Sequence, residues 1–274
     1  MKIIHIFLCI FLFSCQQVKN ENDRVSLNSF EWIDLTHPFS EKTLYWPNNP
    51  KGFTRDTLFE GMTDKGYYYS SFDFYAPEHG GTHLDAPVHF AQGKMTLDEL
   101  SLDQLTGEAV VIDVSANASN NRDYQIQVND VTNWEKEHGT LKENVIILFH
   151  TGYGKFYPDA LTYFGTDKKG EEALPFLHFP GIHPQLAEWL VKNRKIKAVG
   201  LDTPSIDYGQ STDFQTHRIL LAENMPAFEN VANLHLLPAQ NIYVVALPML
   251  LKDGSGGPLR IIASSGPLPP ERGN

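Results

Sequence analysis

Residues 184–201 read PQLAEWLVKNRKIKAVGL, and this stretch decides the fold class. Pro184 predicts the start of a helix that runs to Lys192, because proline is favoured in the first helical turn and basic residues near the end. The run from Ile196 to Leu201 is almost continuously apolar, as expected of a strand buried on both faces. A helix followed directly by a buried strand predicts an α/β domain with a mixed sheet.

Other segments repeat these two patterns along the chain. Apolar runs rich in β-branched residues predict buried strands at 109–114, 145–149 and 242–247. Shorter helices are expected at 128–137 and 218–222. The sequence shows no internal repeat and no low-complexity tract, so a single α/β domain accounts for the pattern.

Length and charge limit the classes of function. The 274 residues are enough for one sizeable core, and the formal net charge is −11. Binding to nucleic acid phosphates requires clustered Lys and Arg, which this acidic chain lacks. A nucleic-acid partner is therefore not expected, and a small-molecule substrate is.

The N-terminus is typical of an export signal. Lys2 precedes an apolar run from Ile3 to Phe13, which is too short to span a bilayer as a helix. The run ends in Leu12-Phe13-Ser14-Cys15, which resembles a bacterial lipobox in which Cys15 is acylated. An ordinary secretory leader with an incidental cysteine is the alternative.

These features divide the chain into three parts. We expect a lipoprotein signal peptide at 1–15, a polar tether at 16–28 and the enzyme domain at 29–274. The only cysteines are Cys9 and Cys15, so the domain can hold neither a disulfide nor a thiolate metal ligand. The expected location is the periplasmic or cell-surface side of a bacterial membrane, with the N-terminal lipid as the anchor.

The strongest chemical signal is HGGTHLDAPVH at residues 79–89. Two glycines and a proline exclude a helix here, so His83 and Asp85 are expected on one face of an extended segment. The glycine turn can fold His79 back onto that face. Two imidazoles and a carboxylate suit Zn²⁺ or Mn²⁺, and a three-ligand site leaves a position open for water, as in catalytic sites.

His89 is expected to have a different task. Pro87 redirects the chain between Asp85 and His89, which favours a general base or acid over a ligand. The alternative for all of these histidines is that they only satisfy polar groups beneath a loop. Four ligand-type residues at this spacing favour the metal.

The same motif resembles the signature of the metal-dependent cyclase/hydrolase family, which includes bacterial kynurenine formamidase and isatin hydrolase. Three further segments resemble the family: residues 216–221, with Glu229 twelve residues after His217, Leu44-Tyr45-Trp46-Pro47, and Gly254 to Arg260. Together the matches extend from about residue 32 to 263.

The resemblance implies a swivelling β/β/α fold and a metal site completed by His217 and Glu229. It implies one or two ions, with Asp85 and Glu229 as bridges, and a homodimer or larger homo-oligomer. Trp46 would stack on an aromatic substrate, although a tryptophan there could equally be a core or loop aromatic. From the residues alone, a carboxylate within the apolar Pro226-Ala227-Phe228 context needs a cation or a donor if it is buried.

Two further carboxylates, Asp202 and Asp207, follow the predicted strand at 196–201. They could support the site at the end of the sheet or could simply be turn residues.

The expected function is hydrolysis of an aromatic amide, arylformamidase-like, by metal-activated water with His89 moving the proton. A cyclic amide or lactone hydrolase, such as isatin hydrolase, is one alternative, and a non-catalytic metal- or ligand-binding lipoprotein is another. Residues 152–180 form an insertion relative to compact formamidases, which leaves the substrate open. An exported location also weakens a role in intracellular tryptophan breakdown.

Overall fold

The computed structural model describes residues 30–265. The predictions for Cys15, for the leader at 1–15 and for the tether at 16–28 lie outside the described residues. Within the described range, none of the helices combines the length and the apolar character needed to cross a membrane.

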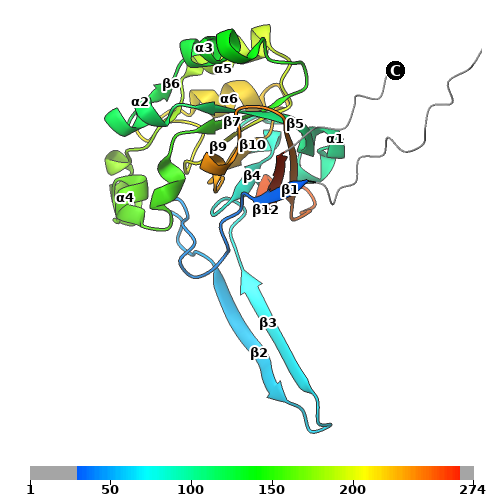
Figure 1. The fold of residues 1–274 in the computed structure, drawn as a ribbon. Coiled ribbons are helices and arrows are strands. Elements are labelled where there is room, and N and C mark those ends of the chain that lie inside the picture. The colour runs from blue at the N-terminus through cyan, green and yellow to red at the C-terminus, as the bar shows by residue number, and fades with distance from the viewer. Residues whose placement is uncertain (1–29, 266–274) are drawn as a thin grey trace, which may run out of the picture.

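A mixed sheet forms the centre of the domain (Figure 1). Strands β5, β7, β9 and β10 run parallel, whereas the remaining neighbours are antiparallel. A pairing of β12 with β4 closes the sheet into a ring, and β1 extends it beyond β12. The strands are β1 (Glu31–Asp34), β4 (His83–Asp85), β5 (Thr106–Asp113), β7 (Ile146–His150), β9 (Ala198–Leu201), β10 (Ala227–Glu229), β11 (Ile242–Pro248) and β12 (Gly256–Ser265).

The four strands predicted from apolar runs are all present as β5, β7, β9 and β11. Strands β7 and β9 are buried almost throughout, whereas in β11 buried residues alternate with partly exposed ones. One core inside the ring contains Leu148, Phe228 and Ile261, and a second lies between the sheet and the helices and contains Ile147, Leu186 and Leu220. A third, smaller cluster includes Tyr163, Phe164 and Phe179.

Helices α3 (Val128–His138), α5 (Pro184–Asn193) and α6 (Gln215–Leu221) cover the outer face of the sheet (Figure 1). The first two match the prediction closely, and α5 begins at its proline. Helix α6 begins three residues before the predicted 218, because Asp207 accepts the backbone N–H groups of Thr216 and His217. The shorter helices are α1 (Leu102–Leu105), α2 (Ser115–Asn120) and α4 (Ala160–Phe164).

A long hairpin projects from the body of the domain and was not predicted (Figure 1). It consists of β2 (Thr54–Met62) and β3 (Tyr68–Tyr75), which form a two-stranded sheet of their own. Its sequence signal was a run of aromatic residues, threonine and serine on either side of Asp64-Lys65-Gly66, where Gly66 has a φ of +82°. A second small sheet pairs β6 (Gln125–Ile126) with β8 (Gly181–Ile182).

Candidate metal centre

Strand β4 carries two of the predicted ligands. It pairs with β10 on one side and with β12 on the other, so all three of its residues are buried. His83 and Asp85 are two residues apart and therefore point to the same face of the strand, as the sequence indicated. His83 Nε2 and Asp85 Oδ1 are 3.2 Å apart.

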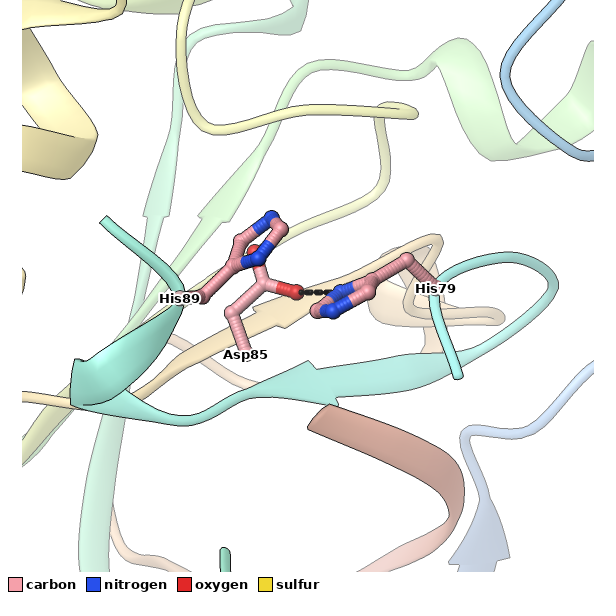
Figure 2. Close-up of side chains that lie close together, drawn as sticks. All are labelled: His79, Asp85 and His89. Carbon is pink, nitrogen blue, oxygen red and sulfur yellow. Dashed lines mark hydrogen bonds and ion pairs between the residues drawn. The ribbon is translucent and has the colours of Figure 1, made fainter. Parts of the chain in front are cut away.

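The glycine turn brings His79 back over this strand. Gly80 and Gly81 have φ angles of +149° and +58°, a region that favours glycine. A Cβ on Gly80 would lie 2.1 Å from a ring carbon of Tyr45, so a side chain has no room there. The turn places His79 Nδ1 2.7 Å from Asp85 Oδ1 (Figure 2).

The other two predicted ligands arrive from elements distant in sequence. The register between β10 and β4 sets Glu229 opposite His83, and the closest oxygen of Glu229 is 3.4 Å from His83 Nε2. His217 lies in the first turn of α6. Its Nε2 is 3.2 Å from an oxygen of Asp85 and 3.2 Å from an oxygen of Glu229.

Asp207 determines the orientation of His217. Besides accepting two N–H groups at the start of α6, its carboxylate accepts the Nδ1 hydrogen of His217 at 2.6 Å. Asp202 has a different role, because it accepts the backbone N–H groups of Thr151 and Gly152 and so holds that loop. Of the two carboxylates flagged in the sequence, only Asp207 contacts a ligand histidine directly.

In each of the three ligand histidines, the outer ring nitrogen has its own acceptor. His83 Nδ1 faces the carbonyl of Gly81, His217 Nδ1 faces Asp207, and His79 Nε2 faces the hydroxyl of Ser255. The hydrogen of a neutral ring is therefore on the outer nitrogen, and the inner nitrogen presents a lone pair. All three lone pairs face carboxylate oxygens, an arrangement that is repulsive unless a cation or a proton lies between them.

The spacing of the inner atoms fits a metal ion. Ligand atoms about 2.0 Å from a tetrahedral Zn²⁺ are about 3.3 Å from one another. The nitrogen–oxygen distances among His83, His217, Asp85 and Glu229 are 3.2–3.4 Å. The residues therefore fit a bound cation, and a donor set of nitrogen and oxygen suits Zn²⁺ or Mn²⁺.

Two overlapping groups within residues 30–265 could each hold an ion. One contains His83, Asp85 and Glu229, the other contains His79, Asp85 and His89, and within each group the ligand atoms lie within 4.8 Å of one another. Asp85 belongs to both groups, which fits its predicted role as a bridge. His89 stacks on His79 with ring centroids 3.8 Å apart (Figure 2), so its position is compatible with proton transfer and with ligation. Its assignment to proton transfer stays a prediction.

The pKa shifts within the cluster reflect the negative charge of its buried carboxylates. Burial alone would lower the pKa of His83, but Asp85 and Glu229 outweigh it and raise this pKa to about 9. Burial and the neighbouring Asp85 raise the pKa of Glu229. Without a metal, protons are therefore drawn into the site. Burial lowers the pKa of His89 to about 4, so this ring is neutral at pH 7.

A cavity of about 240 Å³ opens over the six residues of the cluster. Its walls are largely aromatic and include Trp46, Phe90, Phe164 and Phe214, whereas no Lys or Arg of the described chain lines it. Trp46 contacts Phe214 edge-on. Trp46 thus lines the cavity, its contact with a substrate stays a prediction, and Phe164 comes from the insertion at 152–180.

Sequence reasoning missed a supporting pair beside His79. The Ser255 hydroxyl, facing His79 Nε2 at 2.9 Å, donates to Glu78 at 2.6 Å. A signal was present in Gly254-Ser255-Gly256-Gly257, because a Cβ on Gly256 would lie 2.5 Å from His79 Cε1. The glycine allows β12 to approach His79 closely. Phe90 and Phe214 were also missed, since single aromatics carry no local signature of a pocket.

Comparisons with known proteins agree with this site. The Cyclase family model matches residues 33–208. Isatin hydrolase from Roseibium aggregatum is 30% identical over 194 residues, which cover 68% of this chain and 71% of that protein. Kynurenine formamidase from Salinibacter ruber is 28% identical over 237 residues, which cover 86% of this chain and 99% of that protein.

Two solved structures of isatin hydrolases are similar to this fold. Isatin hydrolase A from Labrenzia aggregata, bound to benzyl benzoate, superimposes with a TM-score of 0.77 at 26% identity, over 87% of this chain and 94% of that one. An isatin hydrolase bound to the product analogue thioisatinate gives a TM-score of 0.78 at 25% identity, over 86% and 93% of the two chains. The expected α/β fold of this family, with its mixed sheet, is confirmed.

Proposed function

Because this chain belongs to the cyclase family of hydrolases, we propose that it cleaves the C–N bond of a small, uncharged aromatic amide, with a cyclic amide as the preferred substrate. A related lactone would be opened at its C–O bond instead. The hydrolase relatives favour an enzyme over the non-catalytic binding protein considered as an alternative. The observation that carries the proposal is the aromatic cavity without a cation above the metal-ligand cluster.

The lining of the cavity favours an uncharged ring. Its volume of about 240 Å³ is smaller than that of most ligand pockets, which measure about 300–1,000 Å³. N-formylkynurenine carries an α-carboxylate, and in this cavity that group would have neither Lys nor Arg as a partner. A buried, unpaired carboxylate is costly, whereas a planar ring gains from contact with Trp46 and Phe214.

The residues of the cluster would have different roles in this reaction. A bound Zn²⁺ or Mn²⁺ would polarise the substrate carbonyl and lower the pKa of water to about 7. The three histidines, Asp85 and Glu229 would hold it, and Asp207 fixes the ring of His217. His89 lines the cavity beside the ligand cluster, where it would take the proton of the attacking water and return it to the departing nitrogen.

One observation favours the arylformamidase alternative. The alignment with kynurenine formamidase from Salinibacter ruber covers 99% of that protein, whereas the alignment with isatin hydrolase from Roseibium aggregatum covers 71%. Both reactions break a C–N bond next to an aromatic ring, so they differ in what the cavity must accept rather than in the chemistry.

Three substrates separate the possibilities: isatin, formanilide and N-formylkynurenine. Formanilide contains the scissile bond of N-formylkynurenine but lacks its charged amino-acid group. With protein loaded with Zn²⁺ or Mn²⁺, we expect kcat/KM to be at least about tenfold higher for isatin and for formanilide than for N-formylkynurenine. His217→Ala is the inactive control. A clear preference for N-formylkynurenine would support the arylformamidase alternative instead.

A further inference from the structure

The insertion at 152–180 directs one buried hydroxyl toward the surroundings of the metal-ligand cluster. Tyr163 lies in helix α4 of this insertion and is fully buried. Its hydroxyl oxygen is 2.8 Å from Asn230 Oδ1 and 3.1 Å from the backbone carbonyl of Asp202. Asn230 lines the same cavity as the ligand cluster. The insertion therefore reaches the site through a polar group as well as through the ring of Phe164.

Asn230 links Tyr163 to the segment that carries the ligand His83. The side-chain Nδ2 of Asn230 donates a hydrogen bond to the carbonyl of Gly81 at 2.7 Å. The same carbonyl accepts the Nδ1 hydrogen of His83 at 2.9 Å, and a carbonyl oxygen has two lone pairs for two such bonds. The hydrogen bonds thus form a chain from Tyr163 through Asn230 and Gly81 to the ring of His83.

The direction of each hydrogen bond in this chain is fixed. A backbone carbonyl can only accept a hydrogen, so the amide atom of Asn230 that faces Gly81 must be the nitrogen. The amide oxygen then faces Tyr163, and the tyrosine hydroxyl must be the donor. Asn230 is buried, so without that hydroxyl its oxygen would lose a donor in a place that water does not reach, which is costly.

The backbone of Asn230 binds the same segment as its side chain. Its φ is +53°, in the left-handed region that asparagine adopts more readily than most residues. Its N–H donates to the carbonyl of Thr203 at 2.9 Å, and its carbonyl accepts the hydroxyl of Thr82 at 2.7 Å. Asn230 therefore holds both Gly81 and Thr82, the two residues that precede His83.

The position of Tyr163 is fixed by the packing of α4. Arg122 donates hydrogen bonds to the carbonyls of Thr162 and His178 at 2.8 and 3.0 Å, which ties the helix to a later part of the insertion. The ring of Tyr163 packs edge-on against that of Tyr157, with centroids 5.6 Å apart. A hydroxyl on a ring that is already immobile can orient its partner at little further cost in conformational entropy.

We propose that Tyr163 and Asn230 are positioning residues of the metal centre, through which the insertion at 152–180 orients the ring of His83. The proposal rests on the metal centre of the proposed function and is independent of the substrate. Loss of an outer partner of a ligand histidine usually weakens metal binding by about 10- to 100-fold. Asn230 binds the carbonyl that holds His83, whereas Tyr163 is one bond further away, so the amide should have the larger effect.

Competition between the purified full chain and a chromophoric chelator for Zn²⁺ tests the proposal. Asn230→Gly removes the amide and leaves a residue that suits the φ of +53°, and we expect it to bind Zn²⁺ about 10- to 100-fold more weakly. Tyr163→Phe removes only the hydroxyl and should bind about three- to tenfold more weakly. The matched control is Tyr153→Phe, which removes the hydroxyl of another buried tyrosine of the insertion and should bind Zn²⁺ like the wild type.

A second measurement separates the orientation of the ligands from a general loss of stability. The visible absorption bands of Co²⁺ bound in place of Zn²⁺ depend on the geometry of its ligands. We expect these bands to change in Asn230→Gly and in Tyr163→Phe, and to stay as in the wild type in Tyr153→Phe. Circular dichroism should show that all three variants are folded.

Three results would overturn the proposal. If both variants match the wild type in Zn²⁺ affinity and in the Co²⁺ spectrum, the metal centre stands but the chain of hydrogen bonds does not support it. If only Asn230→Gly is impaired, or if Tyr153→Phe is impaired as much as Tyr163→Phe, the insertion has no specific part in orienting His83. A wild type that does not bind Zn²⁺ would refute the metal centre together with this proposal.

Discussion

At the scale of single residues, the site depends on which nitrogen of each histidine carries the hydrogen. The acceptors are a backbone carbonyl for His83, a carboxylate for His217 and a hydroxyl for His79. These partners turn three basic nitrogens toward Asp85 and Glu229. The predicted ligand residues thus have the orientation that a cation site requires only because other residues fix it.

His89→Ala tests the division between ligation and proton transfer. We expect the variant to keep near-normal metal content, while hydrolysis of isatin falls by about 10²- to 10⁴-fold, because a general acid/base has been removed. His83→Ala should instead lose metal and activity together. The metal content of each variant, measured by plasma emission spectroscopy, decides between ligation and proton transfer. Loss of metal from His89→Ala would make His89 a ligand, which its position beside His79 also allows.

Ser255→Ala tests the support of His79. Without the hydroxyl, His79 Nε2 loses its acceptor, so we expect metal affinity to fall by about 10- to 100-fold, as for other outer partners of ligand histidines. Competition with a chromophoric chelator measures the affinity. Ser255→Thr, which keeps a hydroxyl, should retain more of it, and Ser101→Ala, at the start of α1, should be unchanged. If Ser255→Ala binds the metal as tightly as the wild type, Ser255 does not support His79 in metal binding.

At the scale of elements, the site forms where short strands meet. Strand β4 has only three residues, yet its two pairings bring Glu229 from β10 and the Ser255 segment from β12 to the same place. Gly200 in β9 permits this packing, because a Cβ there would lie 2.8 Å from Leu148 and 3.3 Å from Phe228. Substitutions at such positions disturb the alignment of whole strands.

The ion pair between α3 and the end of α5 gives a prediction about pH. Arg194 makes two 2.8 Å hydrogen bonds with Glu135, and these bonds lower the pKa of Glu135 below its ordinary 4.5. Because the folded pKa is lower than the unfolded one, the stabilisation is present above pH 4.5 and is lost as the pH falls further. We expect Glu135→Gln to lower the free energy of unfolding by about 1 kcal/mol at pH 7.

Urea denaturation at pH 7 and near pH 3 measures this. The difference between the wild type and Glu135→Gln should shrink at the lower pH. Glu143→Gln, which breaks a much more exposed pair with Lys195, is the control and should have little effect at either pH. A constant difference across pH would contradict the assignment to the ion pair.

At the scale of the whole molecule, the buried cluster predicts that stability depends on a bound metal. Asp85, Glu229, His83 and His217 are all buried, so the apo protein must hold close carboxylates without a cation. We expect a chelator to lower Tm by about 5–10 °C, the effect of losing a ligand held at about 100 times its Kd. Readdition of Zn²⁺ or Mn²⁺ should restore it. His83→Ala should be insensitive to both treatments, and a wild-type Tm that ignores chelator and metal would refute the site.

The location of the molecule gives a further test. We propose that Cys15 is acylated and anchors an exported protein, on the basis of the lipobox-like Leu12-Phe13-Ser14-Cys15. A clickable fatty-acid analogue fed to bacteria should label the wild type and not Cys15→Ser. Equal labelling of both proteins would favour the ordinary secretory leader.

The local patterns of the sequence determined a defined part of this protein. Apolar runs identified β5, β7, β9 and β11, because a continuous apolar run rich in β-branched residues predicts a strand without information from elsewhere in the chain. The turn at Gly80-Gly81 and the alternation of His83 and Asp85 followed from backbone geometry. The resemblance to the family added His217 and Glu229, which spacing alone could not connect to the motif.

The tertiary structure decided every feature that requires contact between segments distant in sequence. His79 and Ser255 are 176 residues apart in sequence and 2.9 Å apart in space, because the pairing of β12 with β4 closes the ring. The aromatic cavity gathers Trp46, Phe90 and Phe214 from three separate segments. The projection of the hairpin is likewise invisible in its sequence, since an alternating strand reads the same whether its apolar face is covered by its own domain or by another surface. Local periodicity specifies which residues share a face, and only the packing of the whole chain specifies what that face meets.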